Sequence, residues 1–316
     1  MAPMTAATAT VPPAALSDAL GALRDREHTA QRLLQASARH SFDPDTELDW
    51  DADWVEGKWF TPPELCSLYG TPLWDGMSPE QRMDLSRHEA AQVAASGIWF
   101  ETILMQLLVR HAYDCDLTSG HVRYALTEIA DECRHSMMFA RLVDKMATPD
   151  YAPRPLDHQL GRVLKTASTA TVTFAAALCV EEILDWNQRL TFSDERVQPL
   201  LRGATRIHVV EEARHVRYAR EELRRQLVAA PRWERAVVRL VTAEVILAVM
   251  RTLGHPRVYA AVGLDPRLAA QVARQSPHRR LVLQRSAERV VAFFTEIGVI
   301  RGATVRAAWR RAQLLP

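Results

Sequence analysis

The sequence predicts an all-α protein, a bundle of four long helices with further helices at its N- and C-terminal ends. Long stretches of the chain repeat apolar residues at intervals of three and four, which is the core-facing stripe of a bundle helix. Pro149, Pro153 and Pro155 separate two of these stretches. Strands are not expected, because apolar and polar residues do not alternate over any useful length.

The elements follow in order. An outer helix is predicted from Leu16 to about Ala38. Residues 41–76 form a long irregular segment with four tryptophans, and loops of this length usually cover a site or wrap a subunit. Residues 78–81 read Ser-Pro-Glu-Gln, a capping box that starts a helix ending near His111. The other expected helices cover about residues 119–146, 157–190, 195–228 and 231–253, then short helices beginning at Asp265 and Ser276 and a basic helix after Gly302.

Length and composition set limits on the function. The 316 residues suffice for a large core, and residues 16–316 are predicted to form one domain after a disordered tail, residues 1–15. A net charge of +1 does not indicate a nucleic-acid or membrane-surface protein, and no transmembrane helix is expected. The four cysteines lie far apart without a CxxC pair, which fits a reducing cytoplasm.

Two short segments share one pattern. Residues 131–135 read DECRH and residues 211–215 read EEARH, so both follow the order acid, Glu, any residue, Arg, His. On a helix, Glu and His three residues apart are neighbours on one face. Such a pair forms half of a metal clamp, which needs one further carboxylate from another helix, as in di-iron carboxylate bundles. Glu101 and Glu181 each stand 31 residues before the Glu of a motif.

These residues fall on the apolar stripes of four successive predicted helices. Carboxylates are rarely buried unless they are paired or bound to metal. Carboxylate and imidazole together suit iron, manganese or zinc. Four Glu and two His can hold two metal ions and leave coordination positions open. The alternative, two coincidental motifs on solvated faces, is disfavoured because apolar stripes run through the predicted ligands, which are Glu101, Glu132, His135, Glu181, Glu212 and His215.

Two positions stay open from the residues alone. Glu181 and Glu182 are adjacent, and the 31-residue spacing favours Glu181. His208 stands four residues before Glu212, as Glu128 does before Glu132, so it is either a seventh ligand or a core histidine bonded to a backbone carbonyl. A regular helix separates His208 and His215 by about 10.5 Å. If both reach one cluster, a distortion such as a π-bulge is expected between them. Glu128 is expected to be a core acid bonded to His208 or to solvent.

The remaining residues of the two motifs have expected roles as well. Asp131 and Glu211 are expected to orient the metal-bound imidazoles, with Arg134 and Arg214 beside them, or else to form surface salt bridges. Cys133 is expected to point away from the Glu/His face as an inert core or outer thiol.

With this ligand set, the chain resembles the p-aminobenzoate N-oxygenase family, non-haem di-iron enzymes that oxidise arylamines to nitro compounds in bacterial natural-product pathways. The resemblance extends from about Trp54 to Leu227. Glu101, Glu132, His135 and Glu181 match the first four ligands of the family. His208, Glu212 and His215 match its H-x-x-x-E-x-x-H run, whose extra histidine distinguishes the family from other ferritin-like sites.

The resemblance implies a ferritin-like fold, two iron ions per chain, and O2-dependent oxidation of an arylamine nitrogen to hydroxylamine, nitroso or nitro. It implies a small-molecule amine as substrate and a reductase or ferredoxin as external electron donor; a homodimer stays an alternative to a monomer. Other open outcomes are C-hydroxylation, azoxy formation, metal storage, or radical generation with Tyr218, which is read as core. Expected pocket residues are Gly97, Phe100, Leu104, Thr171, Phe174 and Asn187.

Overall fold

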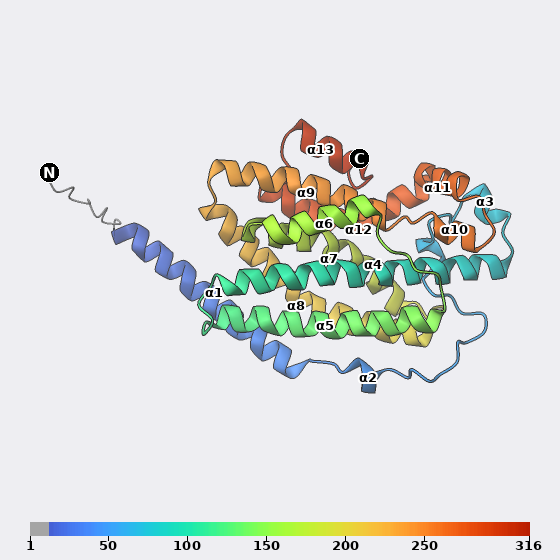
Figure 1. Cartoon of the computed structure of the whole chain (residues 1–316), viewed down its shortest axis with the longest axis horizontal. Helices are drawn as coiled ribbons and strands as arrows, with labels where there is room; N and C mark the ends of the chain where they lie inside the picture. Colours follow the sequence, from blue (N-terminus) through green and yellow to red (C-terminus); the bar gives the residue numbers. More distant parts are fainter. Residues whose placement is uncertain (1–12) are drawn as a thin grey trace.

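The computed structural model describes residues 13–316, with side chains from Asp25 onward, and this range is helical throughout apart from its connections (Figure 1). Strands do not occur in the described range, where a single isolated bridge joins Trp59 and Val197. The all-α prediction is therefore confirmed. The predicted tail lies outside the described residues as far as residue 12, whereas residues 13–15 belong to the first helix.

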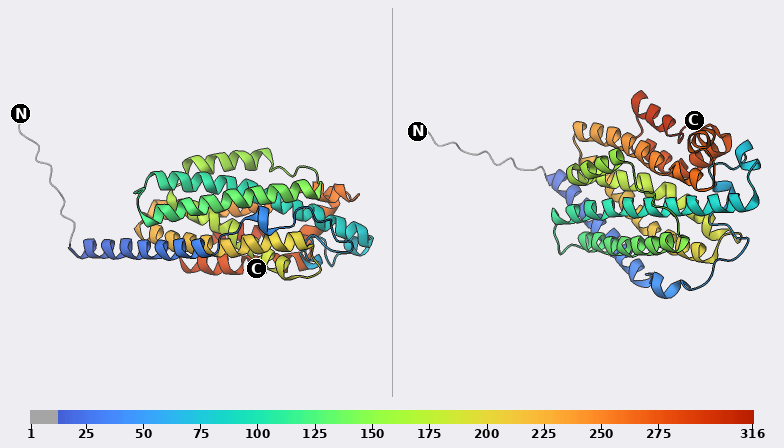
Figure 2. Two further views of the ribbon diagram at one scale, coloured as in Figure 1. Left: turned by 90° about the horizontal axis from the view of Figure 1, so that it is seen from below. Right: turned by 45° about the vertical axis from the view of Figure 1, so that its right-hand side comes forward.

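Two helical hairpins form the core of the bundle. α4 (Pro79–Tyr113) pairs with α5 (Gly120–Met146), and α7 (Ala170–Ser193) pairs with α8 (Pro199–Ala229). All four run along the length of the molecule in each view (Figure 2). Short connections make the partners of each hairpin antiparallel. The predicted capping box starts α4, because Ser78 Oγ accepts from the Gln81 amide at 3.2 Å and Gln81 Oε1 accepts from the Ser78 amide at 3.1 Å.

Other helices cover this core. α1 packs on α5 and α8, α6 on α4, and α9 and α12 on α7. α10 lies against α4, while α11 and α13 pack on α12 and α9. Their bounds are α1 Pro13–Arg39, α6 Pro155–Ala167, α9 Arg232–Thr252, α10 Arg257–Ala261, α11 Pro266–Gln275, α12 Pro277–Glu296 and α13 Ala303–Arg311.

The single helix expected over residues 157–190 is wrong, because the chain breaks between α6 and α7. Ser168 is extended, and Thr169 caps α7 by accepting from the Val172 amide. Arg110 donates to the last carbonyls of α6, at Lys165 (2.7 Å) and Ser168 (3.1 Å). The apolar face of α6 therefore packs on α4 instead of continuing the stripe of α7. Other differences are small: α8 begins at Pro199 rather than 195, α10 was not expected, and α12 is long rather than short.

The segment 41–76 is ordered against the bundle, as its tryptophans predict. It contains three short helical pieces, α2 (Pro44–Glu47), η1 (Pro63–Leu65) and α3 (Pro72–Asp75). Trp50 and Trp74 are buried, and Trp59 stacks on Trp74 at 5.9 Å between ring centroids. Phe60 and Ser67 of this segment line a cavity of the bundle, so the segment covers a site.

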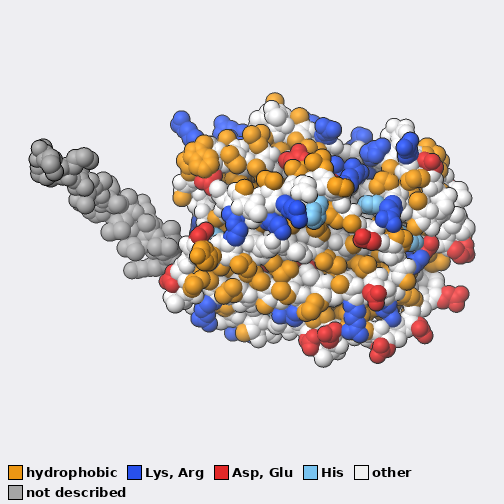
Figure 3. All heavy atoms as spheres, viewed as in Figure 1, with side chains coloured by type: hydrophobic (Ala, Val, Ile, Leu, Met, Phe, Trp, Pro, Cys, Tyr) orange, Lys and Arg blue, Asp and Glu red, His pale blue; other side chains and the backbone are white. Residues whose placement is uncertain are grey.

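By length and composition, α4 is apolar enough to span a membrane, unlike the sequence-based expectation. Half of its most apolar stretch is buried, and α4 packs against α5, α6 and α7 at the centre of the bundle. It also contributes to an outer face where apolar side chains gather over α4 and α5 (Figure 3). The high hydropathy of α4 therefore comes from its buried side at the centre of the bundle and from its contribution to this apolar outer face. Exposed large hydrophobic residues of α4, α5 and α6 are Val109, Tyr113, Leu126, Met137, Leu156 and Val163.

Candidate metal centre

The structure brings all seven predicted ligands together in the middle of the bundle. They come from α4, α5, α7 and α8, and every one is buried. Within each of several groups, one ligand atom per residue lies within 4.8 Å of the others. These groups are Glu101, His135 and His208; Glu132, His135 and Glu212; Glu181, His208 and Glu212; and Glu128, Glu132 and His215.

Glu212 lies between the two histidines of its own helix. Its Oε1 is 2.9 Å from His215 Nδ1 and 3.7 Å from His208 Nε2. The expected distortion of this helix is wrong, since α8 is a continuous α-helix from Pro199 to Ala229. The three residues stand at i, i+4 and i+7 and share one face. Both histidines therefore reach the cluster from either side of Glu212 without a bulge.

His208 faces the carboxylates of the centre. Its Nε2 is 3.4 Å from Glu101 Oε1, and its ring packs on Phe139 at 5.0 Å. Its Nδ1 has no hydrogen-bond partner within the described residues, so a bond to a backbone carbonyl is not what holds it there. The geometry thus favours the ligand alternative over the core-histidine alternative.

Glu128 lies near His215 rather than His208, contrary to expectation. Because α5 and α8 are antiparallel, Glu128, which is one turn before Glu132 on α5, lies beside His215, which follows Glu212 on α8. Burial raises the pKa of Glu128 well above its ordinary value. Its Oε2 has no partner in the described part of the chain. Glu128 is therefore a further oxygen donor beside the centre, which its position on the stripe one turn before Glu132 could have indicated.

The first acid of each motif contacts the histidine of the other motif. His135 Nε2 lies 2.8 Å from Glu211 Oε2, and His215 Nε2 lies 3.1 Å from Asp131 Oδ2. The opposite ring nitrogens face the inner carboxylates, with His135 Nδ1 at 3.2 Å from Glu132. Since Asp131 and Glu211 are buried, they do not form surface salt bridges. Arg134 pairs with Asp131, and Arg214 lies 3.6 Å from Glu211 and 3.5 Å from Asp131.

Glu181 and Glu182 point to different neighbours. Glu181 groups with His208 and Glu212 in the centre. Glu182 accepts from Arg220 Nε at 2.6 Å and is therefore already paired. Glu181 is therefore the member of the pair that faces the centre, where the 31-residue spacing places the predicted ligand.

The chemistry of the centre fits cations. Burial raises the pKa of Glu101, and burial together with Glu212, Glu132 and Glu101 raises the pKa of Glu181. Burial alone would lower the pKa of His135, but Glu132 and Glu211 raise it to about 10. Buried Glu132 Oε1 and Glu212 Oε2 lack partners among the described residues. Two divalent cations would balance the charge of the four inner carboxylates, and Nδ1 of His135 and of His215 faces them.

Comparison with known proteins agrees with this geometry. The model of the family described as p-aminobenzoate N-oxygenase AurF matches residues 23–298. The chain belongs to the AurF family. Three mycobacterial relatives, one from Mycobacterium bovis and two from strains of Mycobacterium tuberculosis, are each 30% identical over 211 residues, and all are described as uncharacterized proteins. The match covers 64% of this chain and 62% of each relative, so the chain spans less than two thirds of their length.

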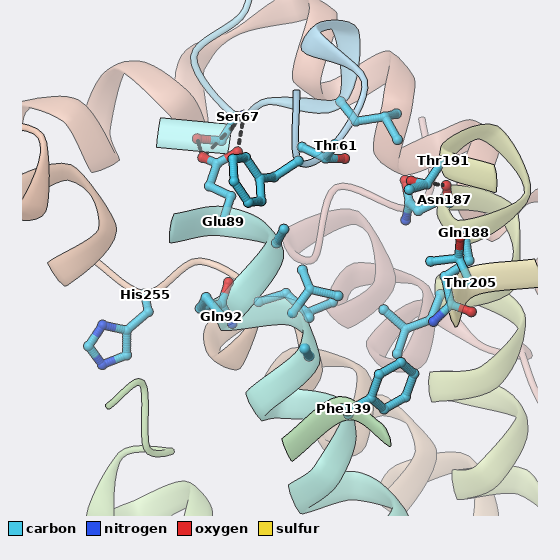
Figure 4. A pocket seen from close by; sticks show the side chains of 18 of the residues that line it. Thr61, Ser67, Glu89, Gln92, Phe139, Asn187, Gln188, Thr191, Thr205 and His255 are labelled. Atoms are coloured by element: carbon cyan, nitrogen blue, oxygen red, sulfur yellow. Dashed lines mark hydrogen bonds between the residues drawn. The ribbon is translucent and has the colours of Figure 1, made fainter. Parts of the chain in front are cut away.

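The AurF-family chain has a cavity of about 190 Å³ on one side of its centre (Figure 4). Glu101, Glu181 and His208 form the inner end of its wall. Along α4 the lining continues back to Glu89, twelve residues before Glu101, which is about 18 Å of helix. The cavity therefore leads from the centre toward the end of the bundle that segment 41–76, α10 and α12 cover.

Three of the six expected pocket residues, Gly97, Phe100 and Asn187, line this cavity, and three do not. Leu104 lines a second, apolar cavity of about 280 Å³ among α4, α6, α7 and α9. The Thr171 hydroxyl donates to Glu234 at 2.7 Å, and Phe174 packs on Tyr218. The difference follows from the direction of each helix. Residues that precede Glu101 on α4 or follow Glu181 on α7 lie on the cavity side of the centre, whereas Leu104, Thr171 and Phe174 lie on the opposite side.

The sequence did not indicate the polar lining of the cavity. Many of these residues come from segments remote in sequence, and spacing within one helix cannot show that they meet. They are Thr61, Ser67, Glu89, Gln92, Gln188, Thr191, Thr205, His255, Tyr259 and Arg279.

Cys133 points away from the centre, as expected, but it is exposed rather than part of the core. Its Sγ lies 3.3 Å from Met105 Sδ on α4. Tyr218 is buried, as expected, and its hydroxyl lies 3.0 Å from His121 Nδ1.

A second group of metal-type side chains lies beyond Tyr218. His111, Cys115 and His121 come within metal-binding distance, with 2.9 Å between the two histidine Nε2 atoms. The Arg26 guanidinium hydrogen-bonds His121 and places a positive charge there. Burial, followed by Arg26, lowers the pKa of His111 to about 4 and of His121 to about 2. The group is thus a network of neutral imidazoles beside a cation.

Proposed function

We propose that this protein is an O2-dependent di-iron oxygenase that oxidises the nitrogen of an arylamine. One turnover converts the amine and O2, with two electrons and two protons, into a hydroxylamine and water. Further rounds would give nitroso and nitro products. The electrons require an external donor such as a reductase or ferredoxin.

A single observation carries the proposal: His208 lies beside Glu101 and Glu212 within a cluster that already holds four carboxylates and two other histidines. Membership in the AurF family supports iron as the metal. Two bound irons would supply the activation of dioxygen and the redox chemistry. Their holders would be Glu101, Glu132, His135, Glu181, His208, Glu212 and His215.

The chain's own residues prepare the site in three ways. Glu211 and Asp131 accept from Nε2 of His135 and His215, which leaves each Nδ1 as the lone-pair donor toward the centre. Arg134 and Arg214 neutralise these two outer acids. Phe139 and Leu184 line the cavity next to the ligands and exclude water from the amine.

Iron content tests the metal part of the proposal. Purified full-length protein, loaded anaerobically with Fe(II) and desalted, is expected to retain about two irons per chain. Glu212→Ala is expected to lose at least one of them, because Glu212 contacts both histidines of its helix. Glu221→Gln, on the same helix but in the partly exposed ion pair with Arg217, serves as the control. Sub-stoichiometric iron after loading contradicts the proposal.

Product analysis tests the reaction. The reduced, iron-loaded protein is mixed with O2 and a panel of arylamines, and mass spectrometry follows the gain of oxygen. N-oxygenated products support the proposal. Ring hydroxylation would indicate a di-iron oxygenase with another outcome. Iron uptake into large assemblies without product would indicate a storage protein.

A further inference from the structure

Gln188 is a buried amide in the wall of the cavity with an unused hydrogen-bonding atom. It is 7% exposed, and its Oε1 has no hydrogen-bond partner within residues 13–316. It stands seven residues after Glu181, two helical turns along the same face of α7 and about 10.5 Å away. Figure 4 shows it among the lining side chains close to Asn187 and Thr205. A buried amide oxygen without a partner is unfavourable, so a group entering the cavity would satisfy it.

The other buried glutamine of the cavity differs in this respect. Gln92 donates from Nε2 to Ser96 Oγ at 2.8 Å and to the Thr252 carbonyl at 2.7 Å. Its amide is used to join α4 to the end of α9. Of these two lining glutamines, Gln188 is therefore the one available to a ligand.

The neighbours of Gln188 are polar but uncharged. Asn187 donates to the Ile183 carbonyl at 3.1 Å and keeps its Oδ1 free for a donor. The hydroxyls of Thr191 and Thr205 donate to backbone carbonyls of their own helices, at 3.0 Å and 2.7 Å. Acceptor oxygens of Gln188 and Asn187 are thus free for a ligand at this depth of the cavity, beside the amide nitrogen of Gln188 as a donor.

The positive charge of the cavity lining lies farther from the centre than Gln188 does. Among the described residues that line the cavity, Arg279 alone is a lysine or arginine. It lies near Glu89, where burial raises the pKa of the carboxyl and Ser67 and Arg279 oppose the rise. Glu89 is about 18 Å along α4 from Glu101, whereas Gln188 is about 10.5 Å along α7 from Glu181, so Glu89 and Arg279 lie beyond Gln188 toward the end of the bundle. A substrate carboxylate beside Gln188 would therefore be buried without a cation, which costs several kcal/mol. Burying a neutral amide, alcohol or phenol at this position would not carry this free-energy cost.

We propose that Gln188 is a specificity-determining residue that hydrogen-bonds an uncharged polar substituent at the end of the substrate opposite its reacting nitrogen. This inference rests on the proposed function, because it takes the amine end to lie at the metal centre. The substrate class is an arylamine with a neutral hydrogen-bond donor, such as a carboxamide or hydroxyl group, opposite the amine. Apolar lining residues such as Val93, Leu184 and Leu201 would contact the ring.

The test compares 4-aminobenzamide, 4-aminobenzoate and 4-methylaniline with the full-length, iron-loaded protein. Binding is measured by anaerobic calorimetry and turnover by mass spectrometry. Wild type is expected to favour 4-aminobenzamide over each of the other two by about tenfold or more in Kd and in kcat/KM. Gln188→Leu is expected to bring the ratio of amide to methyl compound close to one.

Two further variants keep the test decisive. Gln188→Glu preserves size and is expected to shift the preference toward 4-(aminomethyl)aniline, whose cation would pair with the new carboxylate. Gln106→Leu makes the same change at an exposed position of α4 and is expected to leave the wild-type ratio. If 4-aminobenzoate is preferred, or if Gln188→Leu leaves the ratio unchanged, the inference is overturned while N-oxygenation stands. If the binding ratios follow Gln188 but no amine gains oxygen, the proposed function fails and Gln188 keeps its role in recognition.

Discussion

His135 Nε2 on α5 lies 2.8 Å from Glu211 Oε2 on α8, and the relation is reciprocated by His215 and Asp131 at 3.1 Å. Each motif thus supplies a Glu and a His to the centre and an acid that orients the His of the other motif. The antiparallel arrangement of α5 and α8 makes this exchange possible, because it brings the start of one motif next to the end of the other. The two halves of the centre therefore depend on each other.

Removing one outer acid should weaken iron binding without removing a ligand. Glu211→Ala is expected to lower iron affinity about 10- to 100-fold, because His135 would lose the partner that fixes its ring and its tautomer. Competition with a chelator measures the change, with Glu221→Gln as the control on the same helix. Wild-type affinity in Glu211→Ala would show that His135 is held by its packing alone.

Replacing His208 should separate the two interpretations of this residue. His208→Ala is expected to bind fewer than two irons per chain, since its Nε2 faces Glu101 and Glu212. Iron analysis after anaerobic loading and urea denaturation of the metal-free protein are measured side by side. Full iron content with reduced stability would instead assign His208 to the core.

Substitutions of Glu181 and of Glu182 should have different effects. Glu181→Gln is expected to reduce iron content, whereas Glu182→Gln should keep the iron and lower the free energy of unfolding. Breaking the pair with Arg220 is expected to cost about 1–3 kcal/mol, less than for a fully buried pair because Arg220 is partly exposed. Iron analysis and urea denaturation of both variants check this. Loss of iron in Glu182→Gln alone would reverse the assignment.

His121 should make the fold sensitive to mild acid. Burial, followed by Arg26, lowers its pKa to about 2 in the folded protein, against about 6.5 when unfolded. As the pH falls, His121 takes up a proton in the unfolded chain before it does so in the folded protein. The contribution of neutral His121 to the free energy of unfolding is therefore present above pH 6.5 and is lost as the pH falls toward 2. Between pH 6.5 and 5.5 the loss from this group is about 1 kcal/mol.

Urea denaturation across this pH range measures the effect in wild type and in two variants. His121→Gln should remove about 1 kcal/mol of the loss between pH 6.5 and 5.5 and leave the similar contribution of His111, because burial and Arg26 lower the pKa of His111 to about 4. His28→Gln, at an exposed position of α1, should leave the wild-type pH dependence. An equal slope in wild type and His121→Gln would mean that other groups cause the acid sensitivity.

Much of the centre could be predicted because its ligands recur at helical intervals. Glu132 with His135, Glu212 with His215, and the upstream Glu101 and Glu181 follow from spacing along single helices. Spacing favoured Glu181 over Glu182, but it did not by itself decide which of the two turns inward. That choice depends on Arg220, 38 residues away from Glu182, which occupies the alternative position.

Local periodicity and residue chemistry were enough to predict the long helices, the capping of α4 and the inner carboxylates and histidines that meet at the centre. The folded structure was needed to establish the exchange of outer acids, the position of Glu128, the break between α6 and α7, and the end of the bundle at which the cavity lies. Each of these depends on the direction in which one helix packs against another. Helix direction in space is set by burial between elements far apart in the chain, and periodicity along one helix does not contain it.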